Sequence, residues 1–450
     1  MSDMNRFLIT LMSLAASLPL AAQEAPHPMT LHDCMEYALS HSTQMRIRQA
    51  ETGDARIARR DAILAAFLPT LNGSASAYYN FGRNIDPETN TYINTVSFNN
   101  GYSLSAGITL FNGFSAVNNL KISQTSLKMG RTREKQAEAD ICLAVMEAYY
   151  NVLYYEQLLS IYEQQTSVAE GLLTKARRQE ELGQKGHADV VQLEADLADR
   201  RYDLVATRNA LADQRVKLED LLFWPVDEEL VLAGDGVSDL QGSLAPAPAP
   251  ADTLVSFALS HNPAVRLAAW SVENARRELN TARWQLLPSV SLSGGWSTSY
   301  YSFQGTQAVP YWDLLRTNGG EYVALSVNIP IFNRLSRQSS IARHRNALKK
   351  AEAEYDQTQR DVESEVRRAV QDRDGAAAAF EQADRKAGVQ QEAYALNTRK
   401  LEQGLISPLE YQTAAGNYLR AGADRLNSLY QYLIKQSVVR YYGGEDYINQ

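Results

Sequence analysis

The chain contains one structural unit twice. Short motifs from its first half recur, in the same order, about 220 residues later. The matching pairs are Ala38–Ser42 with Ala258–Asn262, Leu68–Leu71 with Leu287–Val290, and Leu110–Gly113 with Ile331–Arg334. A period this long indicates two copies of a whole unit rather than a stack of short repeats. The fold is therefore expected to have internal pseudo-twofold symmetry.

The N-terminus begins with an apolar segment, Phe7–Ala22, which is preceded by Arg6. This pattern is typical of a secretory signal peptide over residues 1–22, cleaved near Ala22–Gln23. A membrane anchor is disfavoured because the segment is short and Pro19 lies near its end. No later apolar run reaches the roughly 18 residues of a transmembrane helix, so any entry into a membrane must use β-strands.

Composition excludes several classes of function. The 44 basic residues against 52 acidic ones (net charge −8) provide no general basic surface for nucleic acid. The histidines show no metal-ligand spacing, and no nucleophile motif or phosphate loop is present. We therefore expect no catalytic residue, metal site or cofactor. The only cysteines, Cys34 and Cys142, are expected to be buried free thiols, although their spacing leaves a mutual bond open.

Each copy is expected to start with a helix and to continue into a β-hairpin. In the first copy, Leu31–Phe67 predicts one helix that ends before Pro69. Apolar and polar residues then alternate in two segments of each copy, separated in the first by a polar loop, Arg83–Ser97. The alternating segments are Leu71–Phe81, Tyr102–Leu110, Val290–Ser297 and Val323–Ile329. They predict four strands of about ten residues, in hairpins at about 68–112 and 287–332.

The predicted strands suit a lipid environment. No charged residue falls within 68–82, 98–115 or 287–311, and the polar positions of the strands hold Ser, Thr and Asn. Aromatic residues gather at the strand ends, where a membrane barrel carries its girdles. The candidate girdle residues are Tyr79, Phe81, Phe111, Trp296, Tyr300, Tyr322 and Phe332. A soluble β-sandwich alternates in the same way, but the uncharged polar face and the signal peptide favour strands in contact with membrane lipid.

Two helices with coiled-coil spacing follow each hairpin. The first, about Ala116–Leu182, contains no proline, and its apolar residues alternate between spacings of three and four. At 1.5 Å per residue it spans about 100 Å. The chain turns back at residues 183–187 in the first copy and at 403–408 in the second. Laid end to end, the shorter helices before the hairpin and after the turn match the long helix in length. This match predicts one two-stranded helical rod per copy.

These elements predict two repeats, residues 23–222 and 252–442, and a C-terminal tail, residues 443–450. Residues 223–251 connect the repeats and end in Pro246–Pro250, a stiff segment that we expect against the outside of the rods. The fold class is mainly α with a small membrane β part. Four strands cannot close a barrel, and open sheet edges are not tolerated in lipid. Closure requires a dimer or a trimer, and the spacing does not choose between them.

From Leu31 to Tyr442 this organisation resembles the TolC-like outer-membrane efflux protein family. The similarity rests on the duplicated element order, on His261–Pro263 at a helix start, on the Leu-Pro strand entries, on Leu-Phe-Asn-Gly at a strand exit and on Gly183–Val190 at the first turn. The first copy departs from the pattern, with Ser42-Thr43 where the family has Asn-Pro. The resemblance implies a homotrimer with a twelve-stranded β-barrel that continues into an α-helical coiled-coil tunnel, in the outer membrane of a Gram-negative bacterium and extending into the periplasm.

The resemblance further implies a passive exit duct of a tripartite efflux or type I secretion system, with a periplasmic adaptor protein and an inner-membrane pump as partners. The family's constricting acidic ring falls here on Asp189 and Glu410, while a further family acid is replaced by Thr413. Three copies of each acid would place six carboxylates around one axis and favour cations in the mouth of the pore. Alternatively, both acids complement the helix dipole as ordinary first-turn residues.

The turns would also meet the adaptor and open as the gate. Their residues are Gly183, Gln184, Lys185, Gly186, His187, Gly404, Leu405, Ile406, Ser407 and Pro408. Leu405-Ile406 is an apolar pair that we expect at an exposed tip, where it suits a partner contact. A plain turn, capped by Ser407 before Pro408, explains the same residues without a partner.

The alternative function is that of a structural protein, a secreted coiled-coil spacer of the cell envelope. The heptad spacing of the helices fits such a spacer equally well. The uncharged hairpins with aromatic residues at their ends do not fit it.

Overall fold

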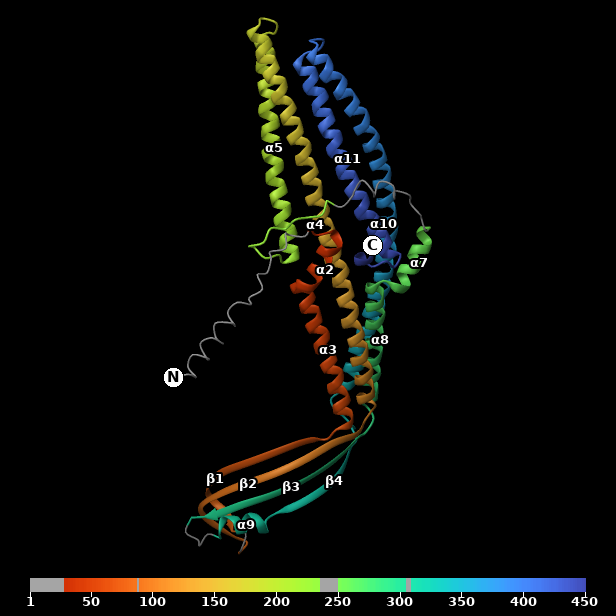
Figure 1. Ribbon diagram of the computed structural model, residues 1–450. Helices are drawn as coiled ribbons and strands as arrows, with labels where there is room; N and C mark the ends of the chain where they lie inside the picture. Colours follow the sequence, from red (N-terminus) through yellow and green to blue (C-terminus); the bar gives the residue numbers. More distant parts are fainter. Residues whose placement is uncertain (1–27, 87–88, 235–249, 305–308) are drawn as a thin grey trace, which may run out of the picture. The chain divides into compact units, whose positions relative to one another are not determined.

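The computed structural model describes residues 28–86, 89–234, 250–304 and 309–450 (Figure 1). The expected signal peptide and most of the connector, including Pro246–Ala249, lie outside the described residues. By its internal contacts the chain divides into two units. One comprises residues 1–43, 138–250 and 368–450, and the other comprises residues 44–137 and 251–367. In the described part of the chain, no helix is both long enough and apolar enough to cross a membrane.

The two repeats form the same elements in the same order. The first contains α2 (Leu31–His41), α3 (Thr43–Phe67), β1 (Thr70–Asp86), β2 (Thr91–Asn112), α4 (Ser115–Glu181) and α5 (His187–Leu222). The second contains α7 (Ala251–His261), α8 (Pro263–Trp284), β3 (Ser289–Phe303), β4 (Gly320–Asn328), α10 (Ser336–Glu402) and α11 (Pro408–Tyr442). The long helices α4 and α10 are both 67 residues, close to the expected length. The short helices α9 (Tyr311–Thr317) and η2 (Tyr447–Asn449) have no counterpart among the described residues of the first repeat.

The prediction of one helix over Leu31–Phe67 was wrong, because the chain breaks at Ser42. The backbone there has φ −58° and ψ 126°, nearly the values of Asn262 (−58° and 130°) at the break between α7 and α8. At Asn262 the side chain accepts a 2.8 Å hydrogen bond from the Ala264 N–H, and Pro263 opens the next helix. Ser42 forms the same break without a following proline.

The β part is larger than expected. Strands β1 and β2 contain 17 and 22 residues instead of about ten, so most of the predicted polar loop Arg83–Ser97 is strand. The extended end of β1 carries a charge that the prediction did not place in a strand, Arg83, whose guanidinium lies 4.1 Å from the centre of the Tyr92 ring. The four strands form one antiparallel sheet in the order β1-β2-β3-β4, with β1 and β4 at its edges.

The strand register separates the apolar residues from the serines. Directly paired residues of an antiparallel sheet lie on the same face. Leu104 pairs with Gly73 and Trp296, whereas its neighbour Ser103 pairs with Ser74 and Ser297. The apolar face continues through the cross-strand set Ile108, Leu292 and Leu325, and the serine face through Ser105, Ser293 and Ser326. The alternation in the sequence thus becomes two chemically distinct faces of one sheet.

Both cysteines are buried free thiols, as expected. Burial, reinforced by the charges of Glu138 and Asp446, raises the pKa of the Cys142 thiol to about 12. Because the thiolate is the reactive form, Cys142 should be inert near neutral pH.

Candidate functional site

The two helical turns have the same backbone construction. Gly183 and Gly404 have φ of 70° and 69°, the left-handed conformation that glycine adopts without strain. The residue after each glycine donates its N–H back across the helix end, Gln184 to Gln179 O and Leu405 to Lys400 O, at 2.8 and 2.9 Å. A bond of this kind, from the residue after a left-handed glycine to a carbonyl five residues earlier, belongs to the Schellman helix ending. The predicted turns at 183–187 and 403–408 therefore lie at equivalent points of both repeats.

The helices that leave the turns begin differently. In α11, Ser407 and Glu410 form a capping box: the Ser407 N–H donates to Glu410 Oε2 at 2.9 Å, and the Glu410 N–H donates to Ser407 Oγ at 3.3 Å. In α5, the cap is Gly186, which has no side chain to bond, and Asp189 is the first-turn acid. Glu410 therefore has a local structural role, whereas the Asp189 carboxylate takes no part in a cap. Thr413 donates its hydroxyl to Leu409 O of its own helix at 3.0 Å.

The apolar pair at the second turn has two roles. Leu405 is 68% exposed, as is suitable for a partner contact. Ile406 instead packs on a buried cluster that includes Leu172 of α4 and Tyr411 of α11. Its expected place at an exposed tip was therefore wrong. At the first turn, His187 Nδ1 lies 2.7 Å from Glu180 Oε1, so this exposed histidine contacts the preceding helix.

A buried ion pair lies three to four turns from the tips, and sequence reasoning did not identify it. Arg200 Nε donates to Asp196 Oδ2 at 2.8 Å, and the two side chains are only 5% and 10% exposed. Their spacing of four residues places them on one face of α5, next to the buried stripe residue Leu197. Two opposite charges on a heptad stripe were the signal that could have indicated this pair.

The pair lies beside a tyrosine cluster of α10 and α11. Tyr411 is fully buried, and its hydroxyl is 3.2 Å from the Tyr394 hydroxyl. Burial and this hydrogen bond raise the Tyr411 pKa, and the Arg200 charge acts in the opposite direction. Nearby, Gln192 Nε2 donates to Gln412 Oε1 at 2.8 Å, and Gln412 Nε2 donates to Gln192 O at 3.0 Å. Buried and polar contacts thus join α5 to α11 close to the turns.

The long helices are also linked near the turns. Lys175 of α4 donates to Glu402 of α10 at 2.8 Å, and both side chains are exposed. Such a surface ion pair contributes at most about 1 kcal/mol. The Arg200–Asp196 pair lies within α5, so the contact between α5 and α11 depends on its burial beside Tyr411 and on the Gln192–Gln412 hydrogen bonds.

Most candidate girdle residues lie on the apolar face of the sheet. Tyr79, Phe81, Trp296 and Tyr300 are there by register, and Phe111 reaches it because a β-bulge after Thr109 shifts its pairing to Val290. Aromatic rings form a row across β1, β2, β3 and α9: Tyr79–Phe98 at 4.9 Å, Phe98–Tyr300 at 6.2 Å and Tyr300–Tyr311 at 4.6 Å between ring centres. Phe98 and Tyr311 belong to this row but are not among the candidate girdle residues.

Two of the girdle expectations do not match the structure. Tyr322 pairs with Gly295 and so lies on the serine face, where the missing side chain of the glycine leaves room for the tyrosine ring. In β4 the apolar-face positions are the odd ones, Val323, Leu325 and Val327, so Tyr322 falls on the opposite face. Phe332 lies after the end of β4 and is 77% exposed.

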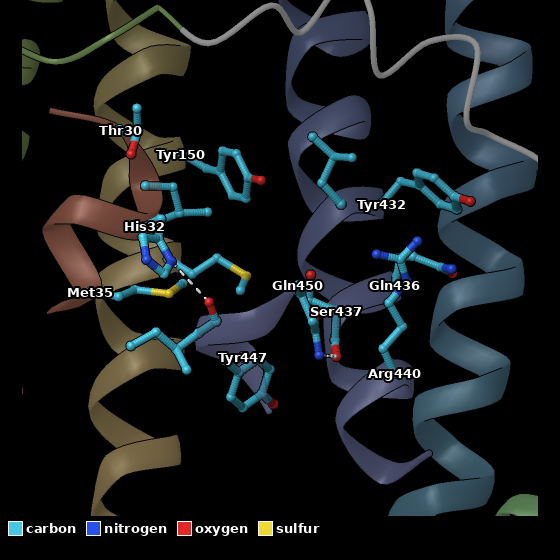
Figure 2. A pocket seen from close by; sticks show the side chains of 14 residues that line it. Thr30, His32, Met35, Tyr150, Tyr432, Gln436, Ser437, Arg440, Tyr447 and Gln450 are labelled. Carbon is cyan, nitrogen blue, oxygen red and sulfur yellow. Dashed lines mark hydrogen bonds between the residues drawn. The ribbon is translucent and has the colours of Figure 1, made fainter. Parts of the chain in front are cut away.

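One cavity of about 280 Å³ lies among α2, α4, α11 and the C-terminal residues (Figure 2). His32 Nδ1 is 2.9 Å from Ile448 O, and Gln450 Nε2 donates to Ser437 O at 3.2 Å. These bonds attach the C-terminal residues to α2 and α11. The cavity is therefore the space left where the C-terminal residues pack on these helices. Within the described ranges, no three His, Cys, Asp or Glu residues are grouped so that they could hold a metal ion.

Comparison with known proteins gives matches over nearly the whole described chain. The sequence matches the outer membrane efflux protein family over residues 35–222 and 254–444. It is 24% identical, over 313 residues, to the outer membrane efflux protein BepC of Brucella suis, a match that covers 68% of this chain and 60% of BepC. It is 24% identical to the protein CyaE of Bordetella pertussis over 363 residues, which cover 78% of this chain and 71% of CyaE.

The fold is also known from solved structures. The outer membrane protein VceC of Vibrio cholerae superposes with a TM-score of 0.76 at 16% identity, covering 93% of this chain and 96% of VceC. Because the family match extends over both repeats and includes both turns and all four strands, the chain belongs to the outer membrane efflux protein family.

Proposed function

We propose that three copies of the chain form a passive outer-membrane channel, the exit duct of a tripartite efflux or type I secretion system. The observation that carries this proposal is the four-stranded sheet with one apolar face, one serine face and two open edges. In lipid, unpaired edge groups cost several kcal/mol each, so β1 of one copy must pair with β4 of the next. Three copies provide twelve strands, enough to enclose a water-filled lumen.

In this assembly the apolar face contacts lipid and the serine face lines the lumen. Nine residues separate Phe111 from Tyr102 on β2, about 30 Å along a strand. With the tilt of about 40° that is usual in barrels, this interval spans about 23 Å, close to the apolar band of an outer membrane. Strands of 17 and 22 residues then extend beyond the lipid, which accounts for Arg83 at the far end of β1.

The helical hairpins continue the duct into the periplasm and form its gate. Opening requires α5 to separate from α11 near the turns, which breaks the Gln192–Gln412 bonds and exposes the Arg200–Asp196 pair within α5. The exposed side chain of Leu405 suits contact with a periplasmic adaptor, which in turn couples the duct to an inner-membrane pump. Energy is supplied by the pump, and the duct itself binds its cargo weakly.

Neighbouring residues on opposite faces of β2 test this function. We expect that Ser103→Cys, labelled with a bulky charged thiol reagent, reduces single-channel conductance severalfold, because its side chain faces the lumen. Leu104→Cys, the matched control, should leave conductance unchanged because it faces lipid. Both cysteines of the natural chain are buried, so the label reports the new position alone. Equal effects at the two positions, or no channel in planar bilayers, would contradict the proposal.

Substitutions at the second turn separate the two roles of Glu410. Glu410→Gln removes the charge but keeps a side chain that can complete a capping box. If the carboxylate belongs to a constricting ring, as we propose, this variant lowers the cation selectivity of the pore, and Asp189→Asn lowers it further. Ser407→Ala, the control, costs about 1 kcal/mol of helix stability through the lost cap and leaves selectivity unchanged. Unchanged reversal potentials in Glu410→Gln with Asp189→Asn would leave both acids as helix-dipole residues only.

A further inference from the structure

The short helix α9 packs on the apolar face of the sheet. The Tyr311 hydroxyl donates to Asn100 Oδ1 at 2.7 Å and lies 3.0 Å from the Tyr102 hydroxyl. Thr298 Oγ1 donates to Leu315 O at 2.5 Å. Tyr102 pairs directly with Thr298, so these strand residues share one face. Two residues further along β2, Leu104 lies on this same face. If that face contacts lipid, α9 lies outside the barrel and does not plug its lumen.

The helix also lies at one boundary of the apolar band. Its contacts on β2 are at Asn100 and Tyr102, about 23 Å from the level of Phe111 for a strand tilted by about 40°. Figure 1 shows α9 at the end of the sheet away from α3 and α8. This location corresponds to the headgroup level of the outer leaflet, and the inference therefore rests on the proposed function.

A groove of about 750 Å³ lies between α9 and the sheet. Half of its eight lining residues are aromatic: Tyr102, Trp296, Tyr311 and Trp312. Trp312 is 78% exposed, an unusual exposure for a tryptophan in contact with water. Tyrosine and tryptophan are enriched where lipid meets water, because one end of each ring system is apolar and the other can form hydrogen bonds.

The remaining lining residues include one acid and one base, Asp313 and Arg316, both exposed. No ion pair joins Arg316 to another residue within the described ranges. A guanidinium binds phosphate through paired, charge-assisted hydrogen bonds, and a carboxylate accepts hydrogen bonds from sugar hydroxyls. The groove therefore combines apolar rings with both groups that a phosphorylated sugar requires. A phosphatidylcholine headgroup has no hydroxyl to donate to Asp313.

We propose that the α9 groove binds the phosphorylated sugar headgroup of an outer-leaflet glycolipid, one molecule per chain. Arg316 binds the phosphate, Asp313 accepts from a sugar hydroxyl, and the rings of Trp296 and Trp312 cover the sugar and the first acyl carbons. The bound glycolipid would attach α9 to the membrane surface.

Native mass spectrometry of the purified assembly tests this proposal. The probes are an acylated, bis-phosphorylated glucosamine disaccharide, phosphatidylcholine and inorganic phosphate. We expect three glycolipids per trimer, and about tenfold weaker binding in Arg316→Gln and in Trp312→Ala. Arg283→Gln, which removes an exposed arginine at the end of α8, is the matched control and should bind like the natural chain.

Three results would overturn the proposal: unchanged glycolipid binding in both variants, equal binding of phosphatidylcholine, or displacement of the glycolipid by inorganic phosphate at matched concentration. The last would identify a simple anion site. The same spectra give the mass of the assembly, which separates this inference from the proposed function. A trimer without glycolipid preference refutes the inference alone, whereas a monomer refutes the channel.

Discussion

Asp196→Ala is expected to accelerate amide hydrogen exchange about a hundredfold or more in α5 and α11 near the turns. The substitution leaves the buried guanidinium of Arg200 without its partner, and breaking a buried ion pair in this way costs about 3–5 kcal/mol. One Arg200 nitrogen, Nη1, is already buried without a hydrogen-bond partner, so the site has no spare acceptor to replace the carboxylate. The contact between the helical hairpins should open more often, and the channel should conduct more in the absence of its partners.

A neighbouring ion pair provides the control. Arg201→Ala removes the bond between Arg201 and Glu170, whose side chains are 61% and 48% exposed. This variant should change the free energy of opening, measured by hydrogen exchange, by less than about 1 kcal/mol. Replacing both members of the buried pair, as Asp196→Leu with Arg200→Met, should restore most of the protection because two packed apolar side chains need no partner. Equal exchange rates in Asp196→Ala and Arg201→Ala would show that the buried pair does not stabilise the packing of α5 on α11.

Gly113→Ala is expected to abolish most of the assembled protein in the membrane fraction. Gly113 connects β2 to α4 with φ of 64°, and a Cβ there would lie 2.3 Å from the carbonyl oxygen of Trp284. That oxygen belongs to the backbone and cannot move aside as a flexible side chain would. Steric overlap of this kind costs about 1–3 kcal/mol, and the left-handed conformation adds about 1–2 kcal/mol, in every copy of the assembly.

The second repeat contains its own control at the equivalent position. Arg334 also has a positive φ, 55°, and so already tolerates a side chain there. Arg334→Ala should therefore assemble normally, and Arg334→Gly should be stabilised by up to about 1 kcal/mol because glycine relieves the strain. The amount of assembled protein in the membrane fraction is the measurement for all three variants. Normal assembly of Gly113→Ala would show that the strand exit is not rigid.

Local patterns were sufficient to predict much of this fold. The alternation in Tyr102–Leu110 gave the two faces of the sheet, and the glycines at 183 and 404 gave the turns, because period and backbone freedom are properties of the residues themselves. The break at Ser42 was missed, since without proline it depends on the surrounding contacts. The added length of β1 and β2 comes from cross-strand pairing, which outweighs the polar character of Arg83–Ser97.

The candidate site was predicted less completely, because its strongest contacts join residues distant in sequence. Asp196 and Arg200 are separated by only four residues, but their importance depends on Tyr411 of the other repeat. Tyr322 was assigned to a girdle by composition, whereas its face is fixed by pairing with Gly295. Helix α9 carries no strong helix signal, and its position on the apolar face follows from the bonds of Tyr311 and Thr298.

The central claim is that separate copies of the chain complete one barrel. The most direct test is the mass of the assembly extracted from membranes in mild detergent, corrected for bound detergent. A mass of three chains is the predicted result, since twelve strands would then satisfy every edge in lipid. A stable monomer would contradict it, because four strands with open edges cannot span a bilayer.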